Sequence, residues 1–155
     1  GQSEAHHRYE GEFALMISQL TVFLEHEEGR LASAVRTISN AGINMQALFL
    51  ADTADFGILR IFCDTPKKAC AALIDAGYRA KLIDVVAVNV SNKPGELANL
   101  MDYLNDTNVN VEYAHCFIVG EYAYDVLKVS DPSLDVKLSA AGFDVCKPED
   151  IYAID

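Results

Sequence analysis

Two short loops carry the residues of this sequence that are best suited to bind a ligand. The first loop reads His26-Glu27-Glu28-Gly29-Arg30-Leu31, and the second reads Asn92-Lys93-Pro94-Gly95-Glu96-Leu97. Each glycine precedes a segment with helical spacing, and the first turn of a helix presents unpaired N–H groups with a partial positive charge. Such a terminus suits a carboxylate, and glycine allows the backbone to approach it closely. Equally, each glycine could serve only to make a tight turn.

An asparagine recurs near the start of a predicted strand in each half of the chain, at Asn44 and Asn110. A side-chain amide offers a hydrogen-bond donor and an acceptor together, which suits the polar head group of a small ligand. The commoner role at such a position is a local hydrogen bond that fixes the turn between helix and strand. Because both asparagines keep the same spacing from their glycine loops, a ligand-binding role stays open beside the structural one.

The two loops belong to an internal repeat of 66 residues. This shift superimposes identical residues, among them Gly29 and Gly95, Leu31 and Leu97, Asn44 and Asn110, and Pro66 and Pro132. Late in the chain the spacing falls to 65, between Gly77 and Gly142. An ordered series of this length predicts two copies of one small structural unit.

Within each copy the hydrophobic pattern changes period in the order strand, helix, strand, strand, helix, strand. In the first copy the predicted elements are a strand at 20–24, a helix at 31–38, strands at 43–51 and 57–63, a second helix that ends at 76, and a strand at 85–90. Gly42 and Asn108 are suited to end the first helix of each copy in a left-handed conformation. Thr65-Pro66 and Asp131-Pro132 place a capping side chain before a proline, which is typical of a helix start.

This pattern predicts an α+β protein with two tandem ferredoxin-like βαββαβ domains, each with a four-stranded antiparallel sheet and both helices on one face. We place the domains at residues 16–83 and 84–155. Residues 1–15 show no clear period and include His6-His7. We therefore interpret them as a leader or tag-like extension.

The composition limits the class of partner. Asp and Glu total 23 and Lys and Arg total 12, which gives a formal net charge of −11. Such a surface repels phosphate groups, so we expect no nucleic-acid partner and no membrane partner. The apolar runs are too short to span a bilayer, and no secretory signal is visible. The four cysteines form no CxxC pair, and we expect reduced, mostly buried thiols in a cytoplasmic protein, with Cys63 and Cys116 as inert core residues.

No residue pattern points to catalysis or to a bound metal. Asp55-Phe56-Gly57 spells the magnesium motif of kinases, but the other kinase motifs are missing, so we interpret it as a turn before a strand. His26 stands among glutamates, where an exposed loop residue, a ligand contact and a metal ligand are open, in that order of preference. We expect no enzyme activity, no cofactor and no metal site.

The loop pattern Asn-x-Pro-Gly-x-Leu, the amphipathic helix after it, and Gly-Ile-Asn at the start of the second strand together resemble the ACT domain. Both copies, over Met16–Asp155, are similar to small stand-alone proteins made of two ACT domains, which also contain a stretch like residues 54–60. The resemblance implies a βαββαβ fold and a regulatory module that binds amino acids or similar small molecules.

The resemblance also implies where the ligand lies, between the glycine loop of one ACT unit and the start of strand two of another. The residues carried over by this resemblance, with their loop neighbours, are His26, Glu28, Gly29, Arg30, Leu31, Asn44, Met45, Asn92, Lys93, Pro94, Gly95, Glu96, Leu97, Asn110 and Val111. Glu28 stands where the family prefers proline, and His26 and Asn92 stand where it prefers an acid. We therefore expect the two sites not to be equivalent.

The resulting hypothesis is a non-enzymatic, amino-acid-binding regulatory protein that forms a homodimer and acts through a protein partner. The alternative is a module for protein–protein interaction and oligomerisation that binds no ligand.

Overall fold

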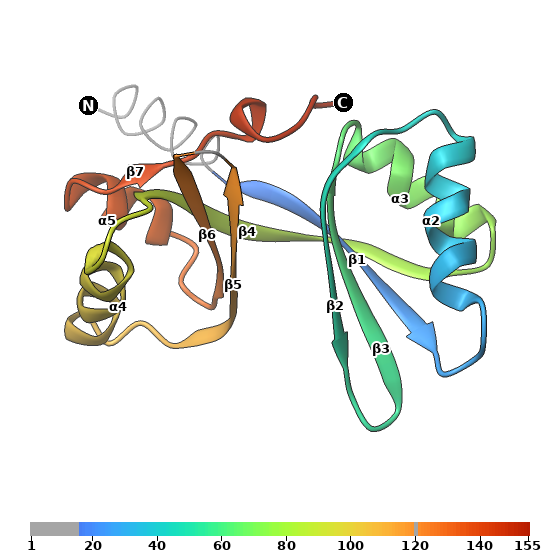
Figure 1. Cartoon of the computed structure of the whole chain (residues 1–155), viewed down its shortest axis with the longest axis horizontal. Helices are drawn as coiled ribbons and strands as arrows, with labels where there is room; N and C mark the ends of the chain where they lie inside the picture. The colour runs from blue at the N-terminus through green and yellow to red at the C-terminus, as the bar shows by residue number, and fades with distance from the viewer. Residues whose placement is uncertain (1–15, 120) are drawn as a thin grey trace, which may run out of the picture. The chain divides into compact units, whose positions relative to one another are not determined.

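The computed structural model describes residues 16–119 and 121–155. Residues 1–15, interpreted above as a leader or tag-like extension, lie outside the described residues. The described chain forms two compact units (Figure 1): an N-terminal unit of Ser18–Ile83 with Pro148–Asp155, and a C-terminal unit of Asp84–Lys147 with residues 16 and 17. The sequence analysis assigned residues 148–155 to the second domain, whereas in the structure they pack with the N-terminal unit.

The N-terminal unit contains two helices on one face of a sheet. Its elements are β1 (Ile17–Glu25), α2 (Arg30–Asn40), β2 (Met45–Asp52), β3 (Phe56–Cys63), α3 (Pro66–Asp75) and the beginning of β4 (Arg79–Ser91). The strands lie in the order β2-β3-β1-β4, and β3 pairs antiparallel with both of its neighbours. Both helices lie on the same side of the sheet (Figure 1), where Ala34, Ile38, Ala69 and Leu73 join the strands in one core.

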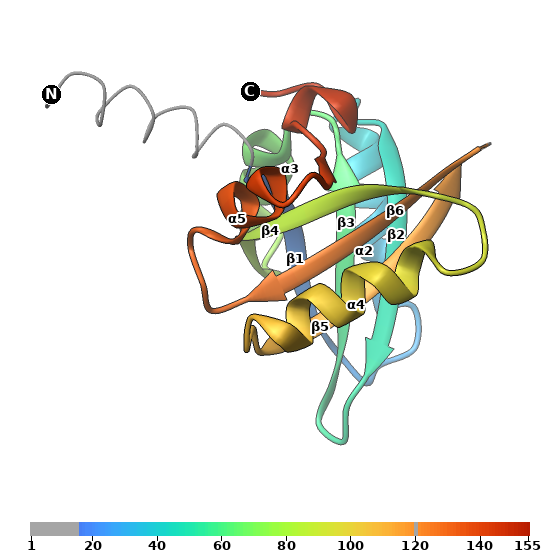
Figure 2. The same cartoon turned by 90° about the vertical axis from the view of Figure 1, so that its left-hand side faces the viewer.

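The C-terminal unit repeats this arrangement. Its elements are the end of β4, α4 (Glu96–Asp106), β5 (Val111–Val119), β6 (Tyr122–Val129), α5 (Leu134–Ala140) and β7 (Asp144–Val145). β6 pairs antiparallel with β4 and with β5, and β4 also pairs with β7. Leu100 and Leu104 of α4 and Leu134 and Leu138 of α5 are buried in its core, and Figure 2 shows α4 on one face of β6. The predicted tandem ferredoxin-like fold is confirmed.

Strand β4 differs from the prediction of a separate strand at the end of one copy and the start of the next. It runs from Arg79 to Ser91 without interruption. Its 13 residues contain no glycine and no proline, so no residue favours a turn within it. The same strand therefore closes the N-terminal unit and opens the C-terminal unit.

The strand registers repeat with the 66-residue shift found in the sequence. Two equivalent rows cross the sheets: Val22, Leu59 and Leu50 in the N-terminal unit, and Val88, Asp125 and Cys116 in the C-terminal unit. The second strand of each unit also has a register shift at the same repeat position. Asp125 therefore stands where the first copy has a core leucine.

The first helix of each unit ends as the sequence predicts. Gly42 and Asn108 have positive φ angles of 76° and 57°, so both take the left-handed conformation that follows a helix. Among the described residues, no helix is long and apolar enough to cross a membrane.

The second helices begin differently from the prediction. α3 starts at Pro66, but Thr65 makes no side-chain capping hydrogen bond and has a left-handed backbone, with φ 46°. A capping side chain normally reaches the first turn from the β region, which explains why this cap is lost. α5 starts at Leu134, and its N-cap is Ser133. Asp131 does not cap the helix itself but binds its N-cap residue: the carboxylate accepts hydrogen bonds from Ser133 N at 2.9 Å and Ser133 Oγ at 2.7 Å.

Candidate functional site

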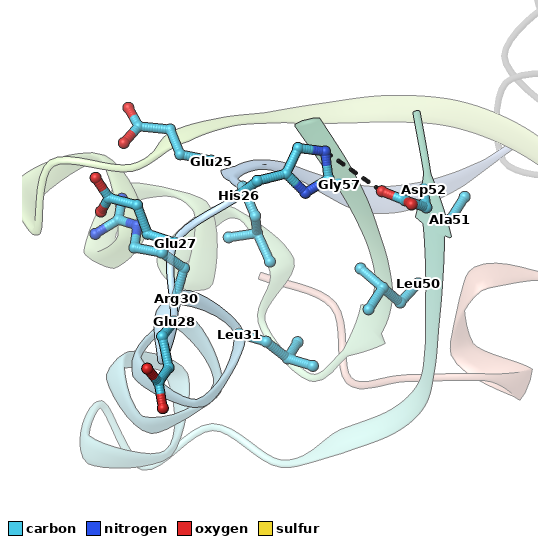
Figure 3. A pocket seen from close by; sticks show the side chains of 11 residues that line it. Glu25, His26, Glu27, Glu28, Arg30, Leu31, Leu50, Ala51, Asp52 and Gly57 are labelled. Carbon is cyan, nitrogen blue, oxygen red and sulfur yellow. Dashed lines mark ion pairs between the residues drawn. The ribbon is translucent and has the colours of Figure 1, made fainter. Parts of the chain in front are cut away.

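A pocket of about 580 Å³ lies beside the first glycine loop, within the N-terminal unit (Figure 3). It lies where the end of β1, the start of α2, the end of β2 and the start of β3 meet. Its lining residues are Leu24, Glu25, His26, Glu27, Glu28, Arg30, Leu31, Leu50, Ala51, Asp52 and Gly57. Leucines supply an apolar wall and the loop supplies charged groups, and the volume suits a small-molecule ligand.

His26 ties the glycine loop to the far side of the pocket. Its Nε2 lies 3.1 Å from the backbone oxygen of Thr53 and 3.4 Å from Oδ1 of Asp52 (Figure 3). Asp52 is the last residue of β2, and Thr53 begins the connection from β2 to β3. The loop is therefore held against the opposite rim of the pocket by a side chain that sequence analysis placed first as an exposed loop residue.

Arg30, the first residue of α2, provides the cation of the pocket. Its guanidinium carbon lies 4.3 Å from the centre of the Tyr78 ring, a geometry typical of a cation–π contact. Tyr78 is itself fixed, because its hydroxyl donates a hydrogen bond of 2.6 Å to Oγ of Ser33. The Nε of Arg30 is buried and has no hydrogen-bond partner among the described residues. The Arg30 side chain is thus positioned by stacking, and its Nε–H group makes no hydrogen bond with the described residues.

Gly29 and Gly95 form the N-caps of α2 and α4, with φ angles of 83° and 93°. This conformation favours glycine, so the turn-forming role considered in the sequence analysis is real. No side chain caps either helix within the described residues, which leaves first-turn N–H groups available. A Cβ atom placed on either glycine would meet no heavy atom within 4 Å, so the space beside both loops is open.

A second pocket, of about 750 Å³, lies beside the second glycine loop in the C-terminal unit. Its lining residues are Asn89, Ser91, Asn92, Lys93, Glu121, Tyr122 and Asp144. Asn89 donates a hydrogen bond of 3.2 Å to Asp144, and its buried Oδ1 has no partner among the described residues. Asn92 and Lys93 are the predicted site residues that line this pocket, while Pro94, Gly95, Glu96 and Leu97 follow at the start of α4. This pocket lacks the leucine wall of the first.

In each unit, the start of the second strand lies at the end of the sheet opposite to the glycine loop. Leu24 and Asp52 both pair with Gly57 beside the first pocket, whereas Met45 pairs with Cys63 at the opposite end of the sheet. The exposed side chains of Asn44 and Asn110, with Met45 and Val111 next to them, are thus separated from the glycine loop of their own unit by the length of a strand. One unit alone does not bring together the two predicted halves of the site.

Sequence analysis missed the residues that reach the first pocket from the sheet, among them Leu24, Leu50 and Asp52. Leu50 is 53% exposed although it lies on the helix-covered face of an edge strand. The signal that could have found it is a leucine pair, Leu48 and Leu50, on the strand predicted at 43–51. A strand side chain beyond the cover of the helices is available to form the wall of a groove.

The cysteines are poorly suited to nucleophilic chemistry. Burial raises the pKa of Cys63 to about 12, and burial together with the neighbouring Asp125 raises the pKa of Cys116 to about 11. Thiols with such pKa values stay protonated at neutral pH, and the thiol is a weak nucleophile. The prediction of a core position is correct for Cys63 but wrong for Cys116, which is exposed because β5 is an edge strand. In the described part of the chain, no group of three or more His, Cys, Asp and Glu side chains could hold a metal ion.

The family model described as an ACT domain pair matches residues 15–138. The crystal structure of protein BT0572 from Bacteroides thetaiotaomicron is 33% identical, with a TM-score of 0.83 over 88% of this chain and 96% of that chain. No curated protein matches the sequence.

Two more distant structures share the fold. The ligand-free regulatory subunit of aspartate kinase from Thermus thermophilus is 16% identical, with a TM-score of 0.57 over 81% of this chain and 91% of that chain. The regulatory subunit of aspartate kinase from Thermus flavus is also 16% identical, with a TM-score of 0.56 over 80% of this chain and 86% of that chain. At this level of identity the likeness concerns the fold alone.

Proposed function

Since this chain belongs to the family of ACT domain pairs, we propose that it is a non-catalytic regulatory protein that binds an amino acid or a similar small molecule at its first glycine loop. The observation that carries this proposal is the uncapped N-terminus of α2 beside a pocket of about 580 Å³ with an apolar wall. An uncapped helix terminus attracts a carboxylate, and the leucine wall suits an aliphatic or aromatic side chain. These are the two parts of a free amino acid that differ most in polarity.

Each part of the ligand has a counterpart in the pocket. The carboxylate meets the first-turn N–H groups of α2, where Arg30 adds positive charge. The ammonium group meets the carboxylates of the rim, with Asp52 on the β2 side and Glu28 on the loop side. The ligand's side chain lies between Leu31 and Leu50, which project toward the pocket from α2 and β2 (Figure 3).

A second unit completes the site in this proposal. Asn44 and Asn110 lie far from the glycine loop of their own unit, so they can reach a ligand only at the loop of another. The edge strands β2 and β5 leave apolar side chains exposed, with Leu48 on β2 and Ile118 on β5. Unpaired edges and exposed apolar groups favour association, and we propose a homodimer.

The regulatory output passes through a partner protein or a change of assembly. In this proposal the bound ligand favours a conformation whose surface that partner, or a second copy of the chain, recognises. The four cysteines are free in the structure, which fits a reduced cytoplasmic setting, and we place the protein there.

Calorimetric titration with the twenty common amino acids tests the proposal, with a matched pair of variants. Leu50→Glu puts a charge on the pocket wall, while Ile74→Glu puts the same charge on α3 outside the pocket; the two side chains are 53% and 54% exposed. We expect at least one amino acid to bind the wild type and Ile74→Glu equally, and to bind Leu50→Glu at least tenfold more weakly, about 1.4 kcal/mol. Binding that is equal in both variants would remove the pocket from the proposal.

The alternative function is an interaction module that binds no ligand. The exposed apolar side chains on the edge strands favour it. Absence of binding heat for all twenty amino acids, together with a stable dimer, would support this alternative over the proposed function.

A further inference from the structure

Residues 148–155, which we call the strap, are anchored on the N-terminal unit by a buried aromatic residue. Tyr152 is 6% exposed, and its ring stacks on that of Phe62 with centroids 6.5 Å apart. Its hydroxyl accepts a hydrogen bond of 2.8 Å from the backbone N–H of Ser18 in β1. The strap is therefore packed into the unit and is more than a surface extension.

Asp155 supplies the cap that α3 lacks. Its two carboxylate oxygens accept hydrogen bonds from the backbone N–H groups of Lys67, at 3.1 Å, and Lys68, at 2.7 Å. In the C-terminal unit the residue equivalent to Lys67 is Ser133, and its N–H is satisfied locally by Asp131. One copy of the repeat thus caps its second helix from within, whereas the other depends on the strap.

The strap also holds Thr65 in an unfavourable conformation. The φ and ψ angles of Thr65 are 46° and 62°, in the left-handed region that β-branched residues rarely occupy. The N–H of Thr65 donates a hydrogen bond of 2.6 Å to the backbone oxygen of Ala153. Residues in such conformations persist only where the surrounding structure imposes them. This hydrogen bond joins the docked strap to the strained residue.

Asp64 connects the strap to the start of strand two. Its Oδ1 accepts hydrogen bonds from Ala153 N at 2.7 Å and from Nε2 of Gln46 at 2.9 Å. Its backbone N–H donates to the backbone oxygen of Asn44 at 2.9 Å. A pocket of about 520 Å³ lies between the strap and these residues. Ser130 stands at the position of Asp64 in the second copy, so this connection belongs to the N-terminal unit.

We propose that the strap is a releasable regulatory segment that closes the strand-two end of the N-terminal unit. This inference rests on the proposed function, in which the Asn44 end completes a ligand site at another unit's glycine loop. While the strap is docked, it engages Asp64 and, through Asp64, Gln46, and both residues are neighbours of the exposed Asn44. When the strap leaves, Thr65 relaxes, Asp64 is freed and the Asn44 end can receive a second unit. The Asn110 end has no such control.

Hydrogen exchange on the full chain tests the docked strap without any ligand. In Asp155→Ala, we expect the amides of Lys67 and Lys68 to exchange about five- to tenfold faster than in the wild type, as for loss of a helix cap. The control Glu149→Ala removes the same charge from the strap outside these hydrogen bonds and should leave both rates unchanged. Equal rates in the wild type and Asp155→Ala would overturn the proposal.

A second variant tests the strain, and calorimetry tests the control of the site. Thr65→Gly removes the conformational penalty of the docked state, so hydrogen exchange at the Ala153 amide should slow. Unchanged or faster exchange of that amide would contradict the inference that the docked strap strains Thr65. In titrations with the twenty amino acids, Asp155→Ala should bind more ligand molecules per chain than the wild type. An unchanged stoichiometry would refute regulation by the strap, whereas no binding by the wild type would refute the proposed function and leave the exchange result to decide docking.

Discussion

Replacing Asp125 by Asn should make the protein more stable at neutral pH. Asp125 is 3% exposed, and its Oδ2 is buried without a hydrogen-bond partner in the described part of the chain. Its other contact is the thiol of Cys116, which donates to the carboxylate and is a weak donor. The residue occupies the place of Leu59 in the first copy, where the core is apolar. The charge on Asp125 is therefore a cost to the folded state.

The magnitude and its pH dependence follow from this burial. A buried charge without a partner costs more than a buried neutral polar group, so Asn, which keeps the shape and removes the charge, should gain about 1–2 kcal/mol at pH 7. Burial raises the pKa of Asp125 above 3.8 in the folded protein. The folded state then binds the proton more tightly, so the charge costs nothing below pH 3.8 and the full cost applies once the pH exceeds the raised pKa. The advantage of Asn should shrink as the pH falls toward 4.

Asp131 provides a matched control with the opposite sign. Hydrogen bonds from Lys137 and then from Ser133 lower the pKa of Asp131 to about 2, so its charge stabilises the fold above pH 3.8 and this contribution is lost as the pH falls through 2. Asp131→Asn should therefore lose about 1 kcal/mol at pH 7, since Lys137 is half exposed and its pairing is screened.

Urea unfolding of the wild type and both variants at pH 7 and pH 4 measures these differences. At pH 7 the urea concentration at half-unfolding should be higher for Asp125→Asn than for the wild type, and lower for Asp131→Asn. At pH 4 the difference between Asp125→Asn and the wild type should be smaller. An Asp125→Asn variant that is less stable than the wild type at pH 7 would refute the argument, because it would mean that the charge is needed.

The remaining predictions concern the second half of the site and the assembly. If Asn44 or Asn110 only fixes its turn, replacement by Ala should lower stability by about 1 kcal/mol and leave amino-acid affinity unchanged; if it holds a ligand, affinity should fall about five- to 150-fold. Melting temperature and calorimetry on both variants separate these roles, and two variants that melt lower yet bind normally would return both residues to the structural role. For assembly, light scattering at micromolar concentration should show a homodimer, and a particle of 17.0 kDa with and without amino acids would contradict this.

The repeat made most of the fold predictable. The spacing that relates Gly29 to Gly95 also relates the strand registers, because both copies build the same sheet. The buried stripe of α2, with Ala34 and Ile38, follows directly from the helical period. Predictions from the local pattern succeeded for the features that both copies share, namely the strand register and the buried stripe of the first helix.

The features that were missed depend on contacts between distant parts of the chain. Tyr152 and Asp155 lie at the end of the predicted second copy, and nothing in their local sequence shows that they pack on β3 and α3. Threonine is a residue type that often caps helices. Thr65 does not cap α3, because its backbone is left-handed where its N–H group binds the docked strap. Asp125 looks like an ordinary strand residue until the register places it among core leucines.

The candidate site was predictable only in part. The loop residues His26, Arg30 and Leu31 were found from the glycine that precedes a helix, and the structure places them on one pocket. Leu50 and Asp52 reach that pocket through strand pairing, which one sequence does not reveal.

The central claim is that an amino-acid carboxylate binds the first turn of α2, and amide chemical shifts of the ¹⁵N-labelled full chain test it most directly. Titration with each of the twenty amino acids should shift the amide signals of Leu31 and Ala32 more than those of any other helix start, in a saturable way. The amides of Lys67 and Lys68 serve as the internal control, because Asp155 already occupies the start of α3. Saturable shifts that leave Leu31 and Ala32 unmoved, or no shifts with any amino acid, would contradict the account.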